Sequence, residues 1–439
     1  MKSNPLRFYI GTLLNPKSDE ECVFLPRGVL VVSGKPGEAK IDAILSEASA
    51  RKRYAGTIRP SNTTDFGNAL IVPGFFDLHF HWVQDEVRTL PKDSLLQWLE
   101  KYTFPAEARF VDPAYAKAKA KPFFKRLLQA GTVGGAVYSS IHECALRSAM
   151  SEARGDFVIG NVLMNMNSPS ALTQTEKESL GLTRKFIQKY GQRFAFTPRF
   201  AITTPPQVMK EGARMADQAG CFKQTHLSEN LDEIQFTLSL FKKFAGLEGV
   251  KNYTEVYQKS GMLGPKSLMA HGIHLSEAEW KILSKTRTSI VHCPTSNAPI
   301  EEQGLGSGLF DFKKAQRAKV RWALGSDIGG GPILSMLDVM RSFVQQNRKS
   351  GQRGASYVQA LYRATGAGAS ILGVGDRAGN FRKGKDASFV VLEIPSLKGI
   401  QSAEQALAAV IEPLSKKRDA YDLLPRAVSL RGRLSWNRP

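Results

Sequence analysis

The sequence predicts an α/β protein, a TIM-type (β/α)₈ barrel accompanied by a small β-sandwich domain that both chain ends form together. Its 439 residues are enough for one barrel with additions. After residue 72, short apolar strands alternate with helical stretches, which is typical of a parallel α/β fold. Near both chain ends, β runs bounded by Gly and Pro replace this alternation. We expect residues 71–375 to form the barrel, and residues 1–70 and 376–439 to form the two parts of the small domain.

The expected elements follow one another in a regular order. Phe8–Ile10 and Gly28–Val32 are short β runs of the first part of the small domain. Leu127–Tyr138 contains a helix end, a cap at Gly131 and a strand. Later barrel strands, each followed by a turn and a helical stretch, are expected at Phe194–Pro198, Cys221–His226, Leu268–His271, Ser289–His292 and Val320–Asp327. The β runs that return to the small domain are Ala387–Leu392 and Val428–Leu430.

The net charge is unusually positive, because 60 basic residues against 40 acidic ones give +20. Such a charge could attract nucleic acid or an anionic surface. The basic residues are nevertheless spread along the chain, and aromatic residues do not alternate with them as they do in proteins that bind single strands. We therefore expect a generally basic, solvated surface and no specific binding of nucleic acid.

The composition is that of a soluble protein from a reducing compartment. No apolar run approaches the roughly 20 residues that cross a bilayer. The stretch Phe8–Leu14 is a poor signal peptide, because Gly11 interrupts it. The four cysteines lie far apart and form no Cys-x-x-Cys motif, which favours free thiols over disulfides. We expect a cytoplasmic protein that does not bind membranes.

The most informative stretch is Ile71–Trp82. An apolar run stops there at Pro73-Gly74, and a strand-like segment then carries His79 and His81. Side chains alternate along a strand, so both imidazoles project to the same side. Two neutral imidazoles placed in this way supply half of a divalent metal site. Histidine is scarce, with seven in the whole chain, and the pair therefore indicates a function.

Further polar residues end later apolar runs and extend this set. They are His226, with Glu229 three residues later, His271 and Asp327. In a barrel the chemistry takes place at the carboxyl ends of the strands, where these residues are expected. Three imidazoles and one carboxylate from separate strand ends could close around a Zn²⁺ ion and leave a position for water. Zinc would lower the pKa of that water, and Fe²⁺ or another divalent ion also suits nitrogen and oxygen ligands.

The series His-x-His, His-x-x-Glu, His and Asp resembles the amidohydrolase superfamily, and specifically its mononuclear deaminase branch. Within that branch the chain is similar to the guanine deaminase family from about residue 70 to 392. The most specific part is Trp98–Glu107, with the sequence Trp-Leu-Glu-Lys-Tyr-Thr-Phe-Pro-Ala-Glu. Other matching stretches are Leu95–Phe110, Thr197–Phe200, Thr225–Asn230, Lys251–Thr254, Met269–Gly272 and Ser326–Gly330. The resemblance implies hydrolytic deamination of guanine to xanthine and ammonia in purine metabolism, with one zinc ion per chain, and a homodimer.

The resemblance also implies roles for individual residues. It assigns proton transfer to Glu229 and the orientation of the attacking hydroxide to His271. Attack at C2 of guanine needs a proton delivered to a ring nitrogen and then to the departing amine, which suits a carboxyl group. Asp327 could take the proton from water. The implied zinc ligands are His79, His81, His226 and Asp327. The residues implied to contact the purine are Gln84, Arg199, Phe200, His226, Glu229 and Asp327.

The chemistry of three of these side chains agrees with purine binding. Arg199 has forked donors for the acceptors of the ring, and Gln84 has both a donor and an acceptor. Phe200 can cover a planar base. A structural interpretation of Arg199 is that it pairs with a carboxylate of the protein.

Other functions are compatible with parts of the sequence. The same chemistry could act on 8-oxoguanine, a pterin, cytosine or a triazine. A binuclear enzyme that cleaves cyclic amides would need a carbamylated lysine before the third histidine, for which Lys223 is a candidate. An inactive barrel would have lost ligands, and none of the expected ones is missing. Between Asn297 and Ser307 the chain is a few residues longer than the family pattern, which could reshape a loop over the pocket.

Several remaining motifs have structural interpretations. The histidines outside the series are expected to be structural, and they are His142, His274 and His292. Gly304–Gly308 lacks the spacing and the preceding strand of a phosphate-binding loop, so we expect a turn. Helical spacing predicts a core position for Leu95, Trp98, Leu99 and Tyr102. The stretch Thr103–Glu107 that follows is expected to be a turn that could line the pocket.

Overall fold

The structure is a computed structural model that describes residues 5–92, 94–352, 354–394 and 396–436. The chain divides into two compact units. Unit 1 comprises residues 1–77, 126–134 and 333–439, and unit 2 comprises residues 78–125 and 135–332.

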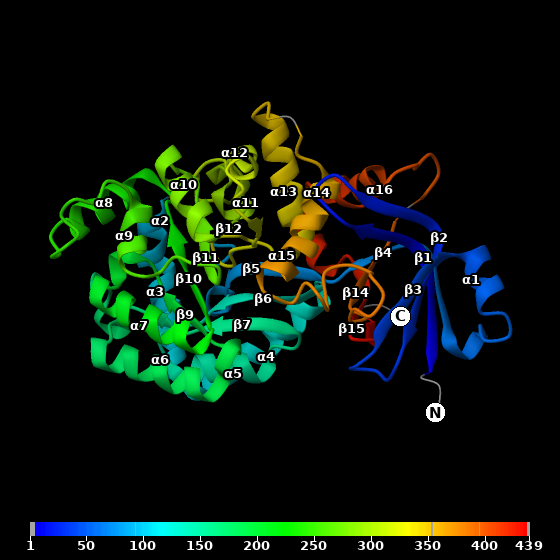
Figure 1. Ribbon diagram of the computed structural model, residues 1–439, viewed down its shortest axis with the longest axis horizontal. Helices are drawn as coiled ribbons and strands as arrows, with labels where there is room; N and C mark the ends of the chain where they lie inside the picture. The colour runs from blue at the N-terminus through cyan, green and yellow to red at the C-terminus, as the bar shows by residue number, and fades with distance from the viewer. Residues whose placement is uncertain (1–4, 93, 353, 395, 437–439) are drawn as a thin grey trace. The chain divides into compact units, whose positions relative to one another are not determined.

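Strands from both chain ends form one sheet in unit 1. Its strands are β1 (Leu6–Pro16), β2 (Cys22–Ser33), β3 (Lys40–Ser46), β4 (Thr63–Pro73), β14 (Phe389–Leu392), β15 (Pro425–Leu430) and β16 (Arg433–Trp436). Their hydrogen-bonded order is β16-β15-β14-β4-β1-β2-β3, in which β14 pairs antiparallel with β4 (Figure 1). The predicted small β domain of both chain ends is confirmed. Its strands belong to one continuous sheet rather than to two separate sheets.

Apolar residues on both faces stabilise this sheet. Phe8 and Val31 lie opposite each other in β1 and β2 and pack with Ala50 of helix α1 (Glu47–Arg53). On the other face, the rings of Tyr9 and Phe389 lie 4.9 Å apart within a second buried cluster. Successive side chains point to opposite faces of a strand, so an unbroken apolar run suits a sheet that is covered on both sides. The other helices of this unit are α13 (Met336–Lys349), α14 (Tyr357–Arg363), α15 (Gly366–Ile371) and α16 (Ala403–Ile411).

The remaining strands form the predicted (β/α)₈ barrel. In chain order they are β5 (Phe75–His81), β6 (Thr132–Tyr138), β7 (Asp156–Gly160), β8 (Val162–Leu163), β9 (Ala195–Pro198), β10 (Phe222–Leu227), β11 (Ser267–His271), β12 (Ser289–His292) and β13 (Trp322–Leu324). Only Asn161 separates β7 from β8, and these two segments make up one strand of the barrel. They pair in the orders β5-β6-β7 and β8-β9-β10-β11-β12-β13. A parallel bridge between Ile159 and Phe194 connects the two sets. The last strand approaches the first through a hydrogen bond: Asp327 N, after β13, donates to His79 O of β5 at 2.8 Å.

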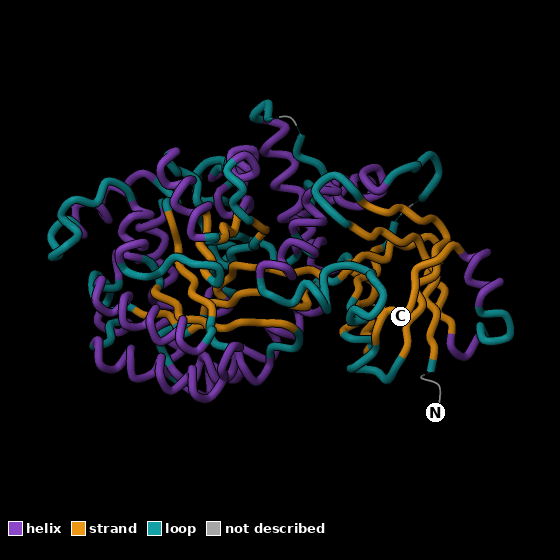
Figure 2. The backbone as a smooth tube through the Cα atoms, viewed as in Figure 1, coloured by secondary structure: helices purple, strands orange, loops and turns teal. Residues whose placement is uncertain are grey.

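Helices surround these strands in Figure 2, and α5, α6 and α7 lie along the outside of β7 and β9 in Figure 1. Local signals explain where several helices begin. Thr175, Asn230 and Ser276 each make a capping box with a glutamate three residues later. The helices are α2 (Leu95–Trp98), α3 (Phe104–Ala108), α4 (Pro113–Gln129), α5 (Glu143–Glu152), α6 (Glu176–Tyr190), α7 (Pro206–Ala219), α8 (Leu231–Phe241), α9 (Tyr253–Lys259), α10 (Glu277–Thr286), α11 (Pro294–Asn297) and α12 (Phe312–Arg317).

Two local predictions were wrong. Thr103–Glu107 is helical rather than a turn, because a π-helical segment at Leu99–Thr103 leads directly into α3. The strand expected at Val320–Asp327 covers only Trp322–Leu324, because the chain leaves the extended conformation before Asp327. Strands β3 and β7 were not anticipated, since neither carries a long apolar run. The expected turn at Gly304–Gly308 is irregular, as predicted.

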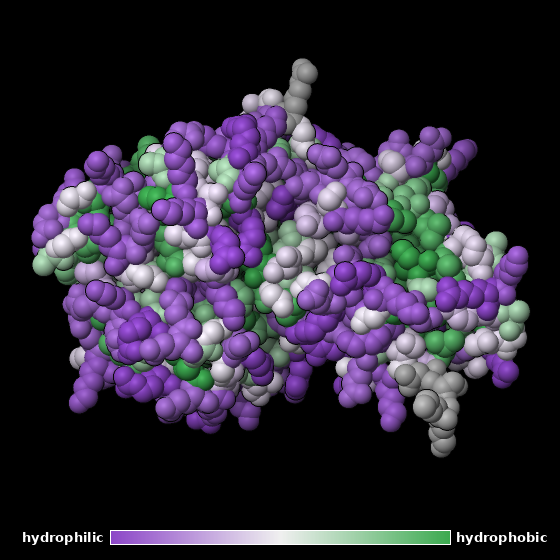
Figure 3. All heavy atoms as spheres, in the orientation of Figure 1, coloured by the Kyte–Doolittle hydropathy of each residue, from purple (hydrophilic) through white to green (hydrophobic). Residues whose placement is uncertain are grey.

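Hydrophilic residues cover most of the face seen in Figure 3. Exposed basic side chains pair with carboxylates, as Lys185 of α6 does with Glu143 of α5 and Arg214 with Glu211 within α7. Pairs of this kind are typical of a solvated surface. In the part of the chain that the structure describes, every helix is too short or too polar to span a bilayer.

Candidate metal centre and adjoining pocket

Four histidines and one aspartate converge at the carboxyl ends of the barrel strands. His79 and His81 come from β5, His226 from β10 and His271 from β11, while Asp327 follows β13. Nε2 of His79 lies 3.2 Å from Asp327 Oδ1, and Nε2 of His81 lies 3.2 Å from Nε2 of His226. One donor atom from each of His79, His226, His271 and Asp327 lies within 4.8 Å of the others. The structure thus brings together all five residues that the sequence singled out for this centre.

The backbone at two of these positions adopts an unusual conformation. His271 has φ 71° and Asp327 has φ 51°, which is the left-handed region that residues other than glycine seldom occupy. Such conformations cost on the order of 1–3 kcal/mol each and are concentrated at functional sites. At Asp327 the hydrogen bond from its own N–H to His79 O holds this conformation. The local backbone therefore aims both side chains at the centre at a cost in stability.

Burial keeps the imidazoles neutral, which metal ligation requires. Burial lowers the pKa of His79, and it lowers the pKa values of His81 and His226 well below the usual range. Burial opposes ionisation of Asp327, but the hydrogen bond with His79 and the electrostatic effect of His79, His271 and His226 together outweigh it, and its pKa is lowered. Neutral imidazoles and an ionised carboxylate are a donor set that fits a divalent metal ion.

Neighbouring groups orient the rings. Nδ1 of His226 lies 2.6 Å from Arg199 O, so this nitrogen donates to the carbonyl and leaves Nε2 facing the centre. Tyr257 Oη donates to His226 O at 2.8 Å and fixes the backbone of the same residue. Asn297 Nδ2 lies 3.1 Å from Nδ1 of His271. These contacts are of the kind that orients the ligands in metal sites.

Lys223 does not approach this centre. Its Nζ donates to Asp217 Oδ2 and to Gly261 O, each at 2.9 Å. Side chains alternate along β10, so Lys223 and His226 point to opposite sides of the strand. The contacts of Lys223 therefore disfavour the binuclear interpretation that we considered for it.

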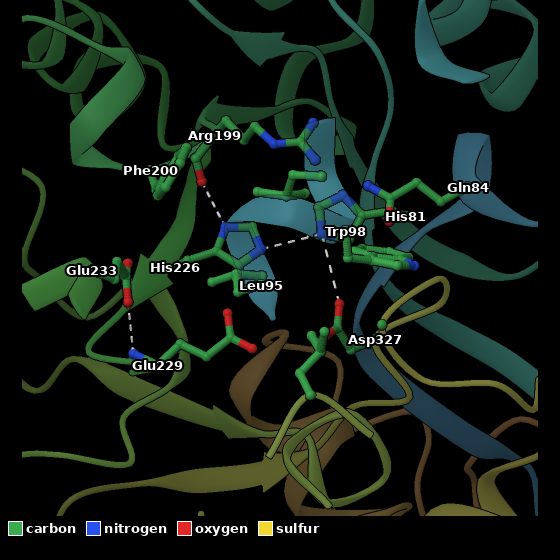
Figure 4. A pocket seen from close by; sticks show the side chains of 13 residues that line it. His81, Gln84, Leu95, Trp98, Arg199, Phe200, His226, Glu229, Glu233 and Asp327 are labelled. Carbon is green, nitrogen blue, oxygen red and sulfur yellow. Dashed lines mark hydrogen bonds and ion pairs between the residues drawn. The ribbon is translucent and has the colours of Figure 1, made fainter. Parts of the chain in front are cut away.

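Glu229 follows the end of β10 and lies beside the centre. In Figure 4 its carboxylate points into the space between His226 and Asp327. Its Oε2 lies 3.5 Å from His271 Nε2, and Ser307 Oγ donates to its Oε1 at 3.3 Å. Burial, followed by the charge of Asp327, raises the pKa of Glu229. The side chain can therefore carry a proton near neutral pH.

The capping box of helix α8 holds Glu229 in place. Asn230 is the N-cap, and its side chain accepts from Glu233 N at 2.9 Å. Glu233 Oε2 in turn accepts from Glu229 N at 2.9 Å. Burial, and the charge of Glu229, raise the pKa of Glu233 to about 7.

A pocket opens beside the centre. Its walls combine apolar side chains with a few polar groups, as Figure 4 shows. The lining residues are His81, Gln84, Leu95, Trp98, Leu99, Arg199, Phe200, His226, Glu229, Glu233, Leu305, Asp327 and Gly330. All six residues that the sequence singled out for purine contact belong to this lining.

A buried carboxylate pairs with Arg199 behind the wall of the pocket. Arg199 Nη1 donates to Glu107 Oε1 at 2.8 Å and to Oε2 at 2.7 Å. Gln84 Nε2 donates to the same Oε1 at 2.7 Å, and Gln84 Oε1 accepts from Gly329 N at 3.3 Å. Glu107 is fully buried. Arg199 therefore has the carboxylate partner that its structural interpretation required, while its side chain and that of Gln84 still line the pocket.

Sequence reasoning missed several members of this site. Glu107, Glu233, Asn297 and Ser307 were not proposed as site residues, because each resembles an ordinary polar residue of a helix or loop. The only available signal was that Glu107 ends the most specific stretch of the resemblance. The extra histidines have packing or loop contacts, since His292 stacks on Phe310 at 4.9 Å and His274 Nε2 lies 2.9 Å from Ser307 O.

Comparisons with known proteins agree with this geometry. Residues 70–417 match the profile of the "Amidohydrolase family". The chain is 36% identical over 391 residues to guanine deaminase of Escherichia coli (strain K12), which covers 87% of this chain and 85% of that protein. It is 30% identical over 367 residues to human guanine deaminase, covering 79% and 78% of the two chains.

Among solved structures, the chain is likewise similar to guanine deaminases. E. coli guanine deaminase superposes with a TM-score of 0.84 at 31% identity, covering 99% of both chains. Guanine deaminase from C. acetobutylicum with bound guanine in the active site superposes with a TM-score of 0.83 at 30% identity, covering 98% of this chain and 100% of that one. The chain therefore belongs to the amidohydrolase family, and within that family it is similar to the guanine deaminases.

Proposed function

We propose that this protein hydrolyses guanine to xanthine and ammonia with the help of a bound divalent metal ion. One observation carries the proposal. The His/Asp centre, the protonatable carboxyl group of Glu229 and the polar side chains of Gln84 and Arg199 all border one pocket. The similarity to guanine deaminases, including one with bound guanine, supports guanine as the substrate.

The metal ion that we propose is zinc, one per chain, held by His79, His81, His226 and Asp327. The donor set supports zinc, because imidazole nitrogens and a carboxylate oxygen are its usual ligands, and a bound ion would take a water molecule as a fifth ligand. When bound, the ion would lower the pKa of that water and so make hydroxide available near neutral pH. His271, 3.5 Å from Glu229 and 4.0 Å from Asp327, is positioned to orient the attacking oxygen.

Glu229 and Asp327 would handle the protons. Asp327 takes the proton released by the attacking water. Glu229 delivers its proton to the ring nitrogen N3 beside C2. It then takes the proton of the new C2 hydroxyl and passes it to the amino group, so that the C–N bond breaks, ammonia leaves and C2 keeps a carbonyl oxygen. The proton held by Asp327 restores Glu229 for the next turnover. The raised pKa of Glu229 supports this role, because a carboxyl that holds its proton near neutral pH can act as a general acid.

The other wall of the pocket would hold the base. Arg199 and Gln84 present donors and an acceptor to its polar edge. Phe200, whose ring centroid lies 6.4 Å from that of His226, would cover one face of the ring. We also propose that the protein is a cytoplasmic homodimer, which sedimentation velocity and fractionation of cells would test.

The proposed function is tested with purified, full-length protein and guanine, by following the ultraviolet spectrum for xanthine. Zinc-loaded wild-type protein is expected to form xanthine, while a chelated sample and a Glu229→Gln variant lose at least about 100-fold in rate. Metal analysis of the same samples should give one zinc per wild-type chain. Returning zinc to the chelated sample should restore the rate.

Two results would contradict the proposal. Absence of xanthine from a protein that holds one zinc would exclude guanine and leave the other amino-substituted heterocycles, with 8-oxoguanine tested next. Full activity in the chelated sample would exclude the metal-dependent mechanism.

A further inference from the structure

We propose that Glu107 is a positioning residue that sets the charge selectivity of the pocket. Glu107 lies behind the wall and is absent from the lining, so it acts through its charge and by positioning Arg199 and Gln84. The inference rests on the proposed function, because it explains how the same pocket distinguishes a neutral base from an anionic one.

The first step of the argument is geometric. Both carboxylate oxygens of Glu107 accept from a single nitrogen, Arg199 Nη1. This leaves the N–H groups of Nη2 and Nε of Arg199 for other partners. The ring of Phe104 lies against the same guanidinium, 5.2 Å from Arg199 Cζ, so the group is held by a carboxylate and an aromatic face. The guanidinium of Arg199, a residue of the pocket lining, is therefore set in one orientation before any ligand arrives.

Glu107 also decides the orientation of the Gln84 amide. Its Oε1 takes a hydrogen bond from Gln84 Nε2, and Gly329 N donates to the other end of the amide. Reversing the amide would place its oxygen against the carboxylate and its NH₂ group against a backbone N–H. Both contacts would be repulsive, so only one arrangement is stable.

The second step concerns charge. Apart from the histidines, Arg199 is the only basic residue in the described lining of the pocket. Glu107, which is 0% exposed, forms an ion pair with it and balances its charge. A buried guanidinium without this partner would attract anions strongly, because the interior screens charges poorly. With the partner, Arg199 offers directed hydrogen bonds and little net attraction for negative charge. The pocket should therefore favour a neutral base such as guanine over a purine anion.

The test is a double-mutant cycle on full-length, zinc-loaded protein, with wild type, Glu107→Gln, Arg199→Gln and the double variant. The probe is urate, a purine that is an anion at neutral pH, and its Kd is measured by calorimetry. Removing the charge of Glu107 is expected to strengthen urate binding about tenfold, both with Arg199 present and in the Arg199→Gln background. Merely structural damage would weaken urate binding instead.

Guanine kinetics provide the second readout. Glu107→Gln is expected to raise the KM for guanine about tenfold with a smaller change in kcat, because the donors lose their fixed orientation. In the Arg199→Gln background the same change should affect KM much less, because the residue acts largely through Arg199. Glu279→Gln is the matched control: Glu279 is also a buried carboxylate of unit 2, bound to Thr254 and Ser276, and its change should leave both urate Kd and guanine KM unaltered.

The outcomes separate this inference from the proposed function. If Glu107→Gln does not fold, the comparison of Arg199→Gln with the double variant still measures the effect of the Glu107 charge, because the double variant has no unpaired buried charge. The inference is overturned if the urate Kd is the same in wild type and Glu107→Gln, or the same in Arg199→Gln and the double variant where only that pair folds. It is also overturned if none of the proteins binds urate detectably. Failure of wild type to form xanthine would instead refute the proposed function. The urate measurements would still test the effect of the Glu107 charge, because binding of urate requires no turnover.

Discussion

The imidazoles of His79, His81, His226 and His271 form one group, and their different neighbours suggest different tasks. His81 Nε2 lies 3.2 Å from His226 Nε2 and 3.7 Å from Asp327 Oδ1, so it faces the shared centre. His271 Nε2 instead lies between the carboxylates of Glu229 and Asp327, at 3.5 and 4.0 Å. At the scale of single residues, metal binding and orientation of the reacting oxygen can therefore be separated by substitution.

The first prediction separates these two roles. His81→Asn should lower zinc affinity more than about 100-fold, because it removes a direct ligand, and activity should fall with the bound metal. His271→Asn should keep one zinc per chain yet lose activity. Zinc content by mass spectrometry, measured beside the rate of xanthine formation, checks both variants. A His271→Asn protein without zinc would make His271 a ligand and refute our assignment.

The second prediction concerns Ser307, whose hydroxyl donates to Glu229 Oε1 at 3.3 Å. Ser307→Ala removes this contact and leaves the carboxylate less well oriented. We expect kcat to fall by about 3- to 10-fold, which corresponds to one hydrogen bond to a charged or polar group. Steady-state kinetics with guanine test this, and Ser239→Ala, a hydroxyl on the exposed part of helix α8, is the control. An unchanged kcat would show that Glu229 does not need Ser307.

At the scale of elements, the loop at residues 298–308 completes the pocket. Leu305 lines it and Ser307 contacts Glu229, although the loop has no regular secondary structure after Glu302. Lys92 ties this loop to the segment after β5, because its Nζ donates to Gln303 O and to Arg88 O, each at 3.0 Å. Lys92 is 5% exposed, so these hydrogen bonds are shielded from water.

The third prediction tests this connection between loops. Lys92→Met keeps the aliphatic stem and removes the donors, which leaves two carbonyl groups without this partner. The free energy of unfolding should fall by about 1–3 kcal/mol, and the KM for guanine should rise because Leu305 is held less firmly. Urea unfolding and steady-state kinetics measure the two effects. Loss of stability with an unchanged KM would mean that the loop keeps its position without Lys92.

At the scale of the whole molecule, Asp386 connects distant parts of unit 1. It pairs with Lys40 of β3, with Arg431 at 3.1 Å and with Arg377 at 3.3 Å, and its side chain is 5% exposed. Burial opposes ionisation of this carboxyl, but the hydrogen bond and charge of Lys40 and the charge of Arg431 outweigh it and lower its pKa. The ionised form therefore stabilises the folded state.

The fourth prediction follows from the sign of this shift. A carboxyl with a lowered folded-state pKa stabilises the protein above its unfolded pKa of about 3.9, and the contribution disappears as the pH falls through the folded-state value. Asp386→Asn should lower the free energy of unfolding by about 2–3 kcal/mol at pH 7. Thermal unfolding from pH 7 to pH 3 should show wild type and variant converging on the acid side. A difference that stays constant with pH would refute the electrostatic explanation.

Much of the fold could be predicted because it depends on local patterns. The apolar runs that became β9, β10, β11, β12 and β14 are visible in the sequence, and so are the capping residues Asn230 and Ser276. The short strand β13 was overestimated, because the backbone conformation at Asp327 depends on contacts with β5. The helical course of Thr103–Glu107 was missed for a similar reason, since Phe104 and Ala106 pack into a cluster with Tyr138 and Met164.

The sequence by itself determined the barrel, the small β domain and the five residues of the candidate metal centre, because strand periodicity and residue chemistry are properties of neighbours along the chain. Only the tertiary structure decided which side chains form hydrogen bonds and ion pairs with the residues of the site. Glu107 meets Arg199 across 92 positions and Ser307 meets Glu229 across 78. Such contacts form when distant segments pack, and burial then sets the charge of each group. The charge balance of the pocket therefore belongs to the folded molecule and not to any stretch of its sequence.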